Sequence, residues 1–522
     1  MSPLSQLLRQ DRDAASRVAL RWDPDAGLDR SVSWSELLAD VARLRDRLRA
    51  APDGGWVLLT EDAYAFAVGL LALWHSGRYV ISPPNRQLGS LRVLQTRAAG
   101  VLTDRPEWFS EGSSVDPLLR ERHPEISTGI DSRPISESTS FGALDPDSLA
   151  VEFYTSGTTG DEKPVLKKIR HLEDEVHELG ENWDALLKDA IVFASASHQH
   201  LYGMLFGVLW PLSSGHVFQA QHFLHAGELI PRLRAADHSV LASVPTHLKR
   251  LAGHAQSPLL RNQCRTIFSS GGPLPQETAH RIAGFLGEAP IEVLGSTETG
   301  GIAWRRQAPG EVKPLWTPFG PVQIDRDPAL GTLQVRSPFV SVGSADGFST
   351  GDRIALHDEE RFELLGRADR VVKIGERRLD LTRMESQLRG QEWVEDVALT
   401  TLQREIEEPD AERADPIERV AAVVVPSRKG WALIRDSGRR AFCSGLRSSL
   451  ADAWDPVLHP RYWRFVVELP EDQQGKIAQN RLRVLFQDPD WGQLSSDRPE
   501  LLGEIRTRQA IERSCLVPSD LS

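Results

Sequence analysis

Short apolar runs alternate with longer stretches of helical period along the first 300 residues. An apolar run at 56–59 is followed by an apolar stretch over 63–74 and by a second run at 79–81. Short runs bounded by turn residues predict buried strands, and the strand–helix–strand order indicates a parallel sheet. Before them, residues 1–50 are expected to be helical, with a capping start at Ser33-Trp34-Ser35-Glu36.

Further apolar runs predict more strands, and periodic stretches between them predict helices. The expected strands lie at 149–154, 191–194, 240–245, 266–268 and 291–294, and the expected helices at 171–189 and about 200–210. Residues 105–147, rich in proline, serine and acid, are expected to form a long surface connection. The strands that end at 154, 268 and 294 run into loops rich in glycine and hydroxyl residues. Because ligands of open α/β sheets bind at the carboxyl ends of strands, we expect these loops to converge on one edge.

The pattern changes after about residue 315 to short strands and turns. A turn with an acid at its exit is expected at 348–353, and a charged break at 366–370. Apolar runs at 371–374, 397–399 and 420–425 then alternate with helical stretches, which is typical of a small α+β domain.

Length, charge and cysteine usage narrow the class of protein. A chain of 522 residues is too long for one core, so two or more domains are expected. The formal net charge of -12, from 61 basic and 73 acidic residues, disfavours a nucleic-acid partner. Cys264, Cys443 and Cys515 show neither metal-ligand spacing nor a disulfide framework. No signal peptide and no apolar stretch of about 20 residues is evident, so a cytoplasmic protein without stable membrane insertion is expected.

The stretch Tyr154-Thr155-Ser156-Gly157-Thr158-Thr159-Gly160, with Lys163 three residues on, has the composition of a phosphate-binding loop. Glycine permits positive φ and lets backbone N–H groups approach an anion, hydroxyls add donors, and Lys163 adds a cation. The loop lacks the Gly-Lys-Ser/Thr ending of a P-loop, so it is of another kind. The alternative interpretation is an ordinary Gly/Thr turn beside a solvated lysine.

Four more motifs follow this loop in order. They are Gly295-Ser296-Thr297-Glu298, Ser349-Thr350-Gly351-Asp352, Gly366-Arg367-Ala368-Asp369-Arg370, and Leu469-Pro470 followed by Gly475-Lys476-Ile477. Over about residues 30–485 the chain thereby resembles the adenylate-forming superfamily of acyl- and aryl-CoA synthetases, firefly luciferases and peptide-synthetase adenylation domains. His198-Gln199-His200-Leu201-Tyr202-Gly203 with Leu209-Trp210-Pro211-Leu212 looks most like the AMP-ligases of aryl-polyene and xanthomonadin pigment pathways.

The resemblance implies an α/β fold. A large N-terminal domain at 1–365, of mixed sheets with flanking helices and a β-rich subdomain, is expected to bind ATP and the acid. A small mobile α+β C-terminal domain at 366–522 is expected to carry the catalytic lysine. The implied reaction has two steps: a carboxylate attacks the ATP α-phosphate and releases pyrophosphate, and a thiol then takes the acyl group. ATP, Mg²⁺ and a pantetheine thiol of acyl carrier protein or CoA are the implied cofactors and co-substrates.

The resemblance also implies the residues of the site. The expected ATP-binding residues are Thr155, Ser156, Gly157, Thr158, Thr159, Gly160, Lys163, Gly271, Gly272, Gly295, Ser296, Thr297, Asp352 and Arg367. The expected acid pocket consists of His200, Tyr202, Gly203, Thr246, Ser270, Thr299, Gly300 and Gly301. Lys476, Glu298 and His200 are the expected catalytic residues, with Glu298 also the Mg²⁺ ligand and Asp369 the hinge between the domains.

Several of these positions also have a plainer interpretation. Glu298 suits a helix start, where the macrodipole favours an acid, and Asp352 suits a turn. Arg367 alternatively forms a surface salt bridge, which contributes little to stability. His200 alternatively packs at the pocket wall without contacting the substrate carboxylate.

The sequence departs from the family pattern at three positions. Leu294 stands where many members carry an aromatic that packs on adenine, and Pro164 follows Lys163 where most members have proline before it. Glu376 stands where many members have glycine beside the pantetheine channel, so its carboxylate would narrow the channel, although a one-residue shift to Gly375 restores the pattern. The short distance from Asp352 to Gly366 leaves no room for the insertion of the fatty acyl-AMP ligases, which favours a thiol acceptor.

The leading hypothesis is therefore an ATP-dependent acid–thiol ligase acting on a hydroxybenzoate-type aryl acid, with a medium-chain fatty acid as the competing substrate. The second hypothesis is a non-catalytic relative that binds nucleotide or acyl-adenylate, against which intact Lys163, Glu298, Asp352 and Lys476 argue. The third is an unrelated ATPase, which would release ADP without any acid.

Overall fold

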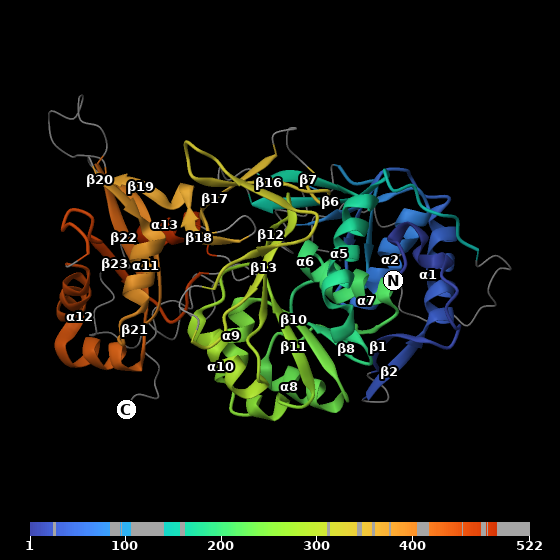
Figure 1. Cartoon of the computed structure of the whole chain (residues 1–522), viewed down its shortest axis with the longest axis horizontal. Helices are drawn as coiled ribbons and strands as arrows, with labels where there is room; N and C mark the ends of the chain where they lie inside the picture. Colours follow the sequence, from blue (N-terminus) through green and yellow to red (C-terminus); the bar gives the residue numbers. More distant parts are fainter. Residues whose placement is uncertain are drawn as a thin grey trace. The chain divides into compact units, whose positions relative to one another are not determined.

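The computed structural model describes residues 1–23, 28–83, 94, 97–105, 140–156, 162–310, 314–341, 347–357, 361–374, 377–404, 417–451, 453–470, 477 and 479–487. The chain divides into two compact units (Figure 1). Unit 1 comprises Met1–Arg326, Gln334–Thr350 and Leu356–Glu363, and unit 2 comprises Asp327–Leu333, Gly351–Ala355 and Leu364–Ser522.

The largest sheet of unit 1 has, in the described residues, nine strands in the order β14-β13-β12-β11-β10-β8-β9-β1-β2. They are β1 (Arg17–Asp23), β2 (Leu28–Ser33), β8 (Ile191–Ala194), β9 (Val217–Gln219), β10 (Ser239–Ser243), β11 (Cys264–Ser269), β12 (Ile291–Ser296), β13 (Gly300–Arg306) and β14 (Thr317–Pro318). The neighbours from β12 to β1 are parallel. Such strands are covered on both faces, which explains why β10 and β11 are continuous buried runs.

The helices of unit 1 largely follow the sequence pattern. They are η1 (Leu4–Arg9), α1 (Trp34–Leu48), α2 (Ala63–His75), α5 (Ile169–Leu187), α6 (Leu201–Met204), the π-helical η3 (Leu205–Leu209), α7 (Trp210–Ser214), α8 (Ala226–Ala235), α9 (Pro245–Gly253), η4 (Ser257–Leu260) and α10 (Gln276–Leu286). The helix expected to end at Trp210 continues through Pro211 to Ser214, with a π-helical turn, η3, directly before α7.

A second, five-stranded sheet has the order β5-β3-β4-β6-β7 in the described residues. Its strands are β3 (Gly55–Leu59), β4 (Tyr79–Ser82), β5 (Gly100–Thr103), β6 (Leu149–Ser156) and β7 (Glu162–Lys168). Strands β3 and β4 are parallel and α2 joins them, so the predicted strand–helix–strand unit is confirmed. The Asp62 side chain caps α2 by accepting from the N–H of Ala65 at 2.7 Å.

The expectation that residues 1–50 are helical is wrong for the middle of this stretch. Strands β1 and β2 pair antiparallel at one edge of the large sheet. Their many arginines and aspartates at half-buried edge positions weaken the apolar alternation that marks a strand. The predicted cap at Ser33 is confirmed, because Ser33 and Glu36 form a reciprocal capping box at the start of α1.

A four-stranded sheet has the order β15-β16-β17-β18 in the described residues. Unit 2 is an α+β structure, in which α12 connects β22 to the parallel strand β23. The elements of the four-stranded sheet and of the rest of unit 2 are β15 (Gln323–Arg326), β16 (Thr332–Arg336), β17 (Phe348–Leu356), β18 (Phe362–Arg367), η5 (Ala368–Arg370), β19 (Val371–Ile374), β20 (Arg377–Asp380), α11 (Leu381–Arg389), β21 (Val394–Arg404), β22 (Ile417–Pro426), α12 (Arg428–Leu450), β23 (Tyr462–Phe465) and α13 (Gln479–Gln487). Among the described helices, none is both long and apolar enough to cross a membrane.

Candidate active site

Four neighbouring parallel strands, β12, β11, β10 and β8, end at one edge of the large sheet (Figure 1). The segments after them carry predicted residues: His200, Tyr202 and Gly203 after β8, Thr246 after β10, Ser270, Gly271 and Gly272 after β11, and Gly295 to Gly301 at β12 and beyond. The expected convergence is therefore confirmed for these loops. The loop after residue 154 follows β6 of the other sheet, and its convergence with these loops stays a prediction, because residues 157–161 lie outside the described part of the chain.

The predicted phosphate loop connects two antiparallel strands. In the register of β6 and β7, Thr155 stands opposite Lys163 and Tyr154 opposite Pro164. Proline is tolerated in β7 because this is the edge strand of its sheet. The roles of the loop stay predictions, because the described part of the chain excludes Gly157, Thr158, Thr159 and Gly160 and the side chains of Thr155, Ser156 and Lys163.

Glu298 lies, half-buried, in the tight turn between β12 and β13. Gly295 is required at this turn, because a Cβ there would lie 2.4 Å from the carbonyl oxygen of Gly300. The Ser296 hydroxyl accepts from the N–H of Thr299 at 3.2 Å, and the Thr299 hydroxyl accepts from the N–H of Ser296 at 3.1 Å. Since a strand follows the turn, the helix-start interpretation of Glu298 is wrong.

Two buried charged side chains contact the backbone of this turn, and sequence reasoning missed both. Lys167 of β7 is 0% exposed, and its Nζ donates to the carbonyl oxygens of Glu298 at 3.3 Å and Phe339 at 2.6 Å. The Oε1 of Glu175 in α5 accepts from the N–H of Gly301 at 2.7 Å. One signal was present: Lys167 shares a face of its strand with the buried Val165, because side chains alternate with a period of two.

Burial shifts the pKa of both groups toward the neutral form. It lowers the pKa of Lys167 to about 8, an effect that the negative charges of Glu175 and Glu298 oppose. Burial raises the pKa of Glu175, and the charge of Lys167 and the N–H of Gly301 oppose that rise. The charges of Lys167 and Glu175 therefore stabilise each other next to the turn.

The loop after β11 has a left-handed backbone at Gly271, with φ +89°. Such a conformation favours glycine and leaves the backbone of 271–272 without side chains that cover it. Ser270 is buried, and its hydroxyl donates to the carbonyl of Val293 at 2.8 Å, which ties the loop to β12. The contact of Ser270 with an acid stays a prediction, because the hydroxyl proton is used within the fold.

The segment after β8 begins α6 at His200, whose carbonyl accepts from the N–H of Met204 at 2.8 Å. Gly203 lets this helix approach the preceding loop, since a Cβ there would lie 2.1 Å from the carbonyl oxygen of Ser197. Burial raises the pKa of the Tyr202 hydroxyl far above its usual range, an effect that the nearby backbone of Ser243, at the end of β10, opposes. Within the described residues this buried hydroxyl has no hydrogen-bond partner.

A cluster of large aromatic side chains packs against the ring of Tyr202. Its ring lies 4.7 Å from that of Phe206, and Phe206 lies 5.6 Å from Trp210 and 5.1 Å from Phe268. Trp183 of α5 extends this aromatic cluster at 5.1 Å from Phe268. Phe206, Trp210 and Phe268 are at most 3% exposed, so the cluster is closely packed.

Sequence reasoning also missed His247 in the first turns of α9. Burial, together with the charge of Arg250, lowers the pKa of its imidazole to about 4, although a hydrogen bond to the backbone of Ser195 opposes the shift. The ring is therefore neutral near pH 7. Its position one residue after Thr246 was the available signal, because Thr246 was already placed at the pocket.

In unit 2, Arg367 lies 3.7 Å from the carboxylate of Asp352, measured from Nη1 to Oδ1. Gly351 has φ +76°, a left-handed backbone that favours glycine at the turn before this pair. Arg370, next to the predicted hinge, donates to the buried Glu385 and to the carbonyl of Leu399, which anchors it to unit 2. The side chain of Asp369 and the whole of Glu376 and Lys476 lie outside the described residues.

The described donors fit a magnesium ion bound together with a nucleotide. In the described part of the chain no three His, Cys, Asp or Glu side chains gather into a metal-binding group. Mg²⁺ commonly takes one or two protein carboxylates and completes its shell with waters and phosphate oxygens. Glu298 offers one such carboxylate on a turn that is fixed by hydrogen bonds.

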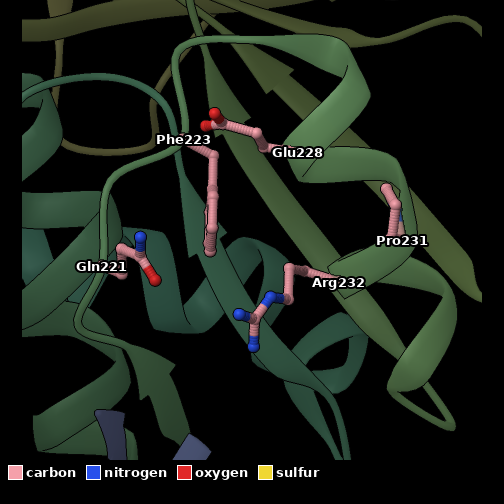
Figure 2. A pocket seen from close by; sticks show the side chains of 5 residues that line it. All are labelled: Gln221, Phe223, Glu228, Pro231 and Arg232. Carbon is pink, nitrogen blue, oxygen red and sulfur yellow. The ribbon is translucent and has the colours of Figure 1, made fainter. Parts of the chain in front are cut away.

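A separate cavity of about 330 Å³ lies beyond the end of β9 (Figure 2). It is lined by Gln221, Phe223, Glu228, Pro231 and Arg232. Figure 2 shows these side chains around an open hollow between α8 and the loop before it. Arg232 is already engaged, with its Nη1 2.7 Å from Asp29 and its guanidinium over the ring of Trp22. None of the predicted site residues lines this cavity.

The sequence pattern of the family described as AMP-binding enzyme matches residues 7–322, which are more than half of the chain. A 4-coumarate–CoA ligase of Rhodobacter capsulatus is 28% identical over 404 residues, 72% of this chain and 92% of that protein. A benzoate–CoA ligase of Thauera aromatica is 25% identical over 370 residues, 65% of this chain and 66% of that protein. A p-hydroxybenzoic acid–AMP ligase of Mycobacterium marinum is 26% identical over 410 residues, 74% of this chain and 53% of that protein.

Solved structures have the same fold. ATP-bound MatB from Rhodopseudomonas palustris has a TM-score of 0.75 at 22% identity, covering 93% of this chain and 98% of that one. A benzoate CoA ligase from Burkholderia xenovorans has a TM-score of 0.72 at 19% identity, covering 92% and 100%. Enzymes of this kind use ATP with Mg²⁺ and a CoA or pantetheine thiol as co-substrate. The chain belongs to the AMP-binding enzyme family, as an adenylate-forming acid–thiol ligase.

Proposed function

We propose that this enzyme activates a compact aryl acid of the hydroxybenzoate type as its acyl-adenylate and transfers the acyl group to a pantetheine thiol. The observation that carries the choice of acid is the aromatic cluster of Trp183, Phe206, Trp210 and Phe268 behind Tyr202. Three relatives whose names specify coumarate, benzoate and p-hydroxybenzoate support the same class.

The aromatic cluster argues against a long alkyl chain. A C8 or longer acid needs a channel that continues past the carboxylate-binding end of its pocket. Next to Tyr202, the side chains of Phe206, Trp210 and Phe268 pack between the helix that follows β8 and strand β11, and each is at most 3% exposed. These side chains would block such a channel. Displacing such packed rings costs several kcal/mol, and binding a single planar ring would not require it. A medium-chain fatty acid therefore remains the second candidate.

The residues would divide the work between the two domains, 1–365 and 366–522. The hairpin loop of Thr155 to Gly160 and Lys163 would hold the β- and γ-phosphates, and Glu298 would hold Mg²⁺, which neutralises their charge. Asp352 has acceptors for the ribose hydroxyls, with Arg367 beside it. Lys476 would neutralise the charge that develops on the α-phosphate and the attacking carboxylate.

The thiol acceptor follows from the short segment between Asp352 and Gly366, which leaves no room for a blocking insertion. Rotation of the C-terminal domain about Asp369 would exchange the adenylation and thiol-transfer conformations, since one site performs two reactions. We place the enzyme in the cytoplasm, with acyl carrier protein or CoA as the acceptor. A pigment-pathway role, in which the acyl group loads a carrier protein, belongs to this proposal.

Acid-dependent exchange of pyrophosphate into ATP tests the proposal. We expect exchange with benzoic, hydroxybenzoic or cinnamic acids and little with C6–C16 fatty acids. Exchange with fatty acids alone would mean that the substrate is an alkyl acid and not an aryl acid. Absence of exchange with every acid, while ATP still binds, would favour a non-catalytic acyl-adenylate-binding relative. A second assay, acyl transfer to CoA against transfer to a phosphopantetheinylated carrier protein, identifies the acceptor.

A further inference from the structure

Lys167 and Glu175 lie eight positions apart, at the end of β7 and within α5, and both contact the segment 298–301. Lys167 donates to the carbonyl at the first residue of this segment, and Glu175 accepts from the N–H of the last. Lys167 also donates to the carbonyl of Phe339, at 2.6 Å. The turn of Glu298 is therefore hydrogen-bonded at both ends to buried charges from the strand and helix that follow the phosphate loop.

The packing of the turn is built around Glu175. Gly300 has φ +68°, and a Cβ there would lie 2.6 Å from Glu175 Oε2 and 2.8 Å from the Cβ of Phe339. At Gly301 a Cβ would lie 2.9 Å from the ring of Phe319. Gly300 therefore leaves room for the carboxylate of Glu175, and Gly301 leaves room for the ring of Phe319.

Stability alone does not account for these two charges. Lys and Glu are rarely buried, and the desolvation of two charges commonly exceeds their mutual attraction. Apolar residues of similar volume often serve stability at least as well. A buried pair does, however, fix a unique geometry when its hydrogen bonds reach a particular backbone segment. Here that segment carries Glu298.

We propose that Lys167 and Glu175 are positioning residues, which hold the Glu298 carboxylate in place for Mg²⁺ by fixing the backbone of residues 298–301. This inference rests on the proposed function and deepens its metal site. Groups that act through the backbone of a metal ligand commonly change metal affinity or activity 10- to 100-fold when removed. Both residues act through the backbone of the Glu298 turn and are therefore positioning residues, not catalytic ones.

The first test replaces the buried lysine by an apolar residue of similar length. We expect Lys167→Met to raise the Mg²⁺ concentration for half-maximal pyrophosphate exchange by about tenfold or more, with the KM for the acid unchanged. Lys168→Met is the matched control, because Lys168 is the next residue of the same strand and its side chain is 40% exposed. A Lys167→Met enzyme whose Mg²⁺ dependence stays within twofold of the wild type overturns the proposal.

The second test uses Glu175→Gln and applies if Lys167→Met does not fold. Glu175→Gln keeps an acceptor for the N–H of Gly301 but removes the charge that favours the Lys167 ammonium. Without the negative charge the turn is held less tightly, so Glu175→Gln should raise the Mg²⁺ concentration for half-maximal pyrophosphate exchange severalfold, with the KM for the acid unchanged. A folded Glu175→Gln enzyme whose Mg²⁺ dependence stays within twofold of the wild type contradicts the proposal.

A failure of the proposed function can be distinguished from a failure of the positioning role. If wild-type enzyme exchanges pyrophosphate with no acid, the ligase assignment to aryl acids fails. The positioning role is then measured by calorimetric titration of ATP into wild type, Lys167→Met and Lys168→Met at several Mg²⁺ concentrations. A weakened Mg²⁺ dependence of ATP binding in Lys167→Met alone supports the positioning role, and equal binding in all three proteins overturns it.

Discussion

The hydroxyl oxygens of Ser296 and Thr299 lie 3.1 Å apart, and each residue donates its backbone N–H to the hydroxyl of the other. This reciprocal pair closes the turn that presents Glu298. The Thr299 side chain is completely buried, and its hydroxyl also donates to the carbonyl of Gly300 at 2.9 Å. The turn is thus fixed by its own hydroxyls as well as by Lys167 and Glu175.

We predict that Thr299→Val lowers both stability and activity. Valine has the shape of threonine but leaves the N–H of Ser296 without its acceptor in a half-buried turn. Such a loss typically costs about 1–3 kcal/mol, which urea unfolding would measure. Pyrophosphate exchange should fall at least tenfold, because Glu298 loses its fixed orientation. Thr278→Val, a buried threonine of α10, is the control: an equal loss of exchange in that variant would mean that stability alone explains the result.

Three histidines with lowered pKa values, the buried His171 and the half-buried His75 and His247, predict a pH dependence of stability. Burial lowers the pKa of His75, His171 and His247 to about 4, whereas an unfolded histidine has a pKa near 6.5. Their contribution to stability is present above about pH 6.5 and is lost as the pH falls toward 4, because the unfolded state then binds more protons. We expect the midpoint of urea unfolding to decrease from pH 7.5 to pH 5.5. His75→Gln should reduce that decrease, and an identical pH dependence in this variant would exclude His75 as a source.

Elements with a strong apolar signal were predictable from the sequence. Strand β10 and helix α2 are buried on almost every side, so their apolar residues form uninterrupted runs. The convergence of the loops after β11 and β12 followed from the parallel order of strands. Strands β1 and β2 were not predictable in this way, because they end the sheet and combine charges with few buried positions.

The candidate site was predictable where chemistry is carried by motifs and not where it depends on tertiary contacts. Glu298 and Ser296 belong to a recognisable tetrapeptide. Lys167 and Glu175 belong to none, and their partners lie more than 120 residues away, at Glu298 and Gly301. The assignment of the phosphate loop to a second sheet also depends on a long-range pairing, that of β4 with β6.

We predict that Lys476→Ala abolishes most of the adenylation activity. Removing a positive charge from a developing oxyanion typically reduces the rate by about 10²–10³. Acid-dependent pyrophosphate exchange measures this loss, while calorimetry should show that ATP still binds. Lys429→Ala is the control, because Lys429 is an exposed lysine of unit 2 that pairs with Glu392. Full exchange in Lys476→Ala would contradict a catalytic role and favour a binding protein.

We predict that Phe206→Leu broadens the acid specificity toward longer chains. Phe206 contacts Tyr202, Trp210 and Phe268, so loss of its ring opens space behind the proposed pocket. The kcat/KM for octanoate relative to hydroxybenzoate should rise about tenfold, since one or two buried methylenes contribute about 1–2 kcal/mol. Phe193→Leu is the matched control. Phe193 is equally buried, but it packs in another core cluster, against Phe223, Ile230 and Leu241.

Both variants should lose a similar amount of stability, because each loses part of a buried ring. A change of specificity in Phe206→Leu alone therefore reports on the pocket and not on a loosened fold. An equal change in both variants would attribute the effect to general destabilisation. No change in either would mean that the acid does not extend toward Phe206. The aromatic cluster would then give no argument between an aryl and an alkyl acid, and the choice would rest on the exchange assay.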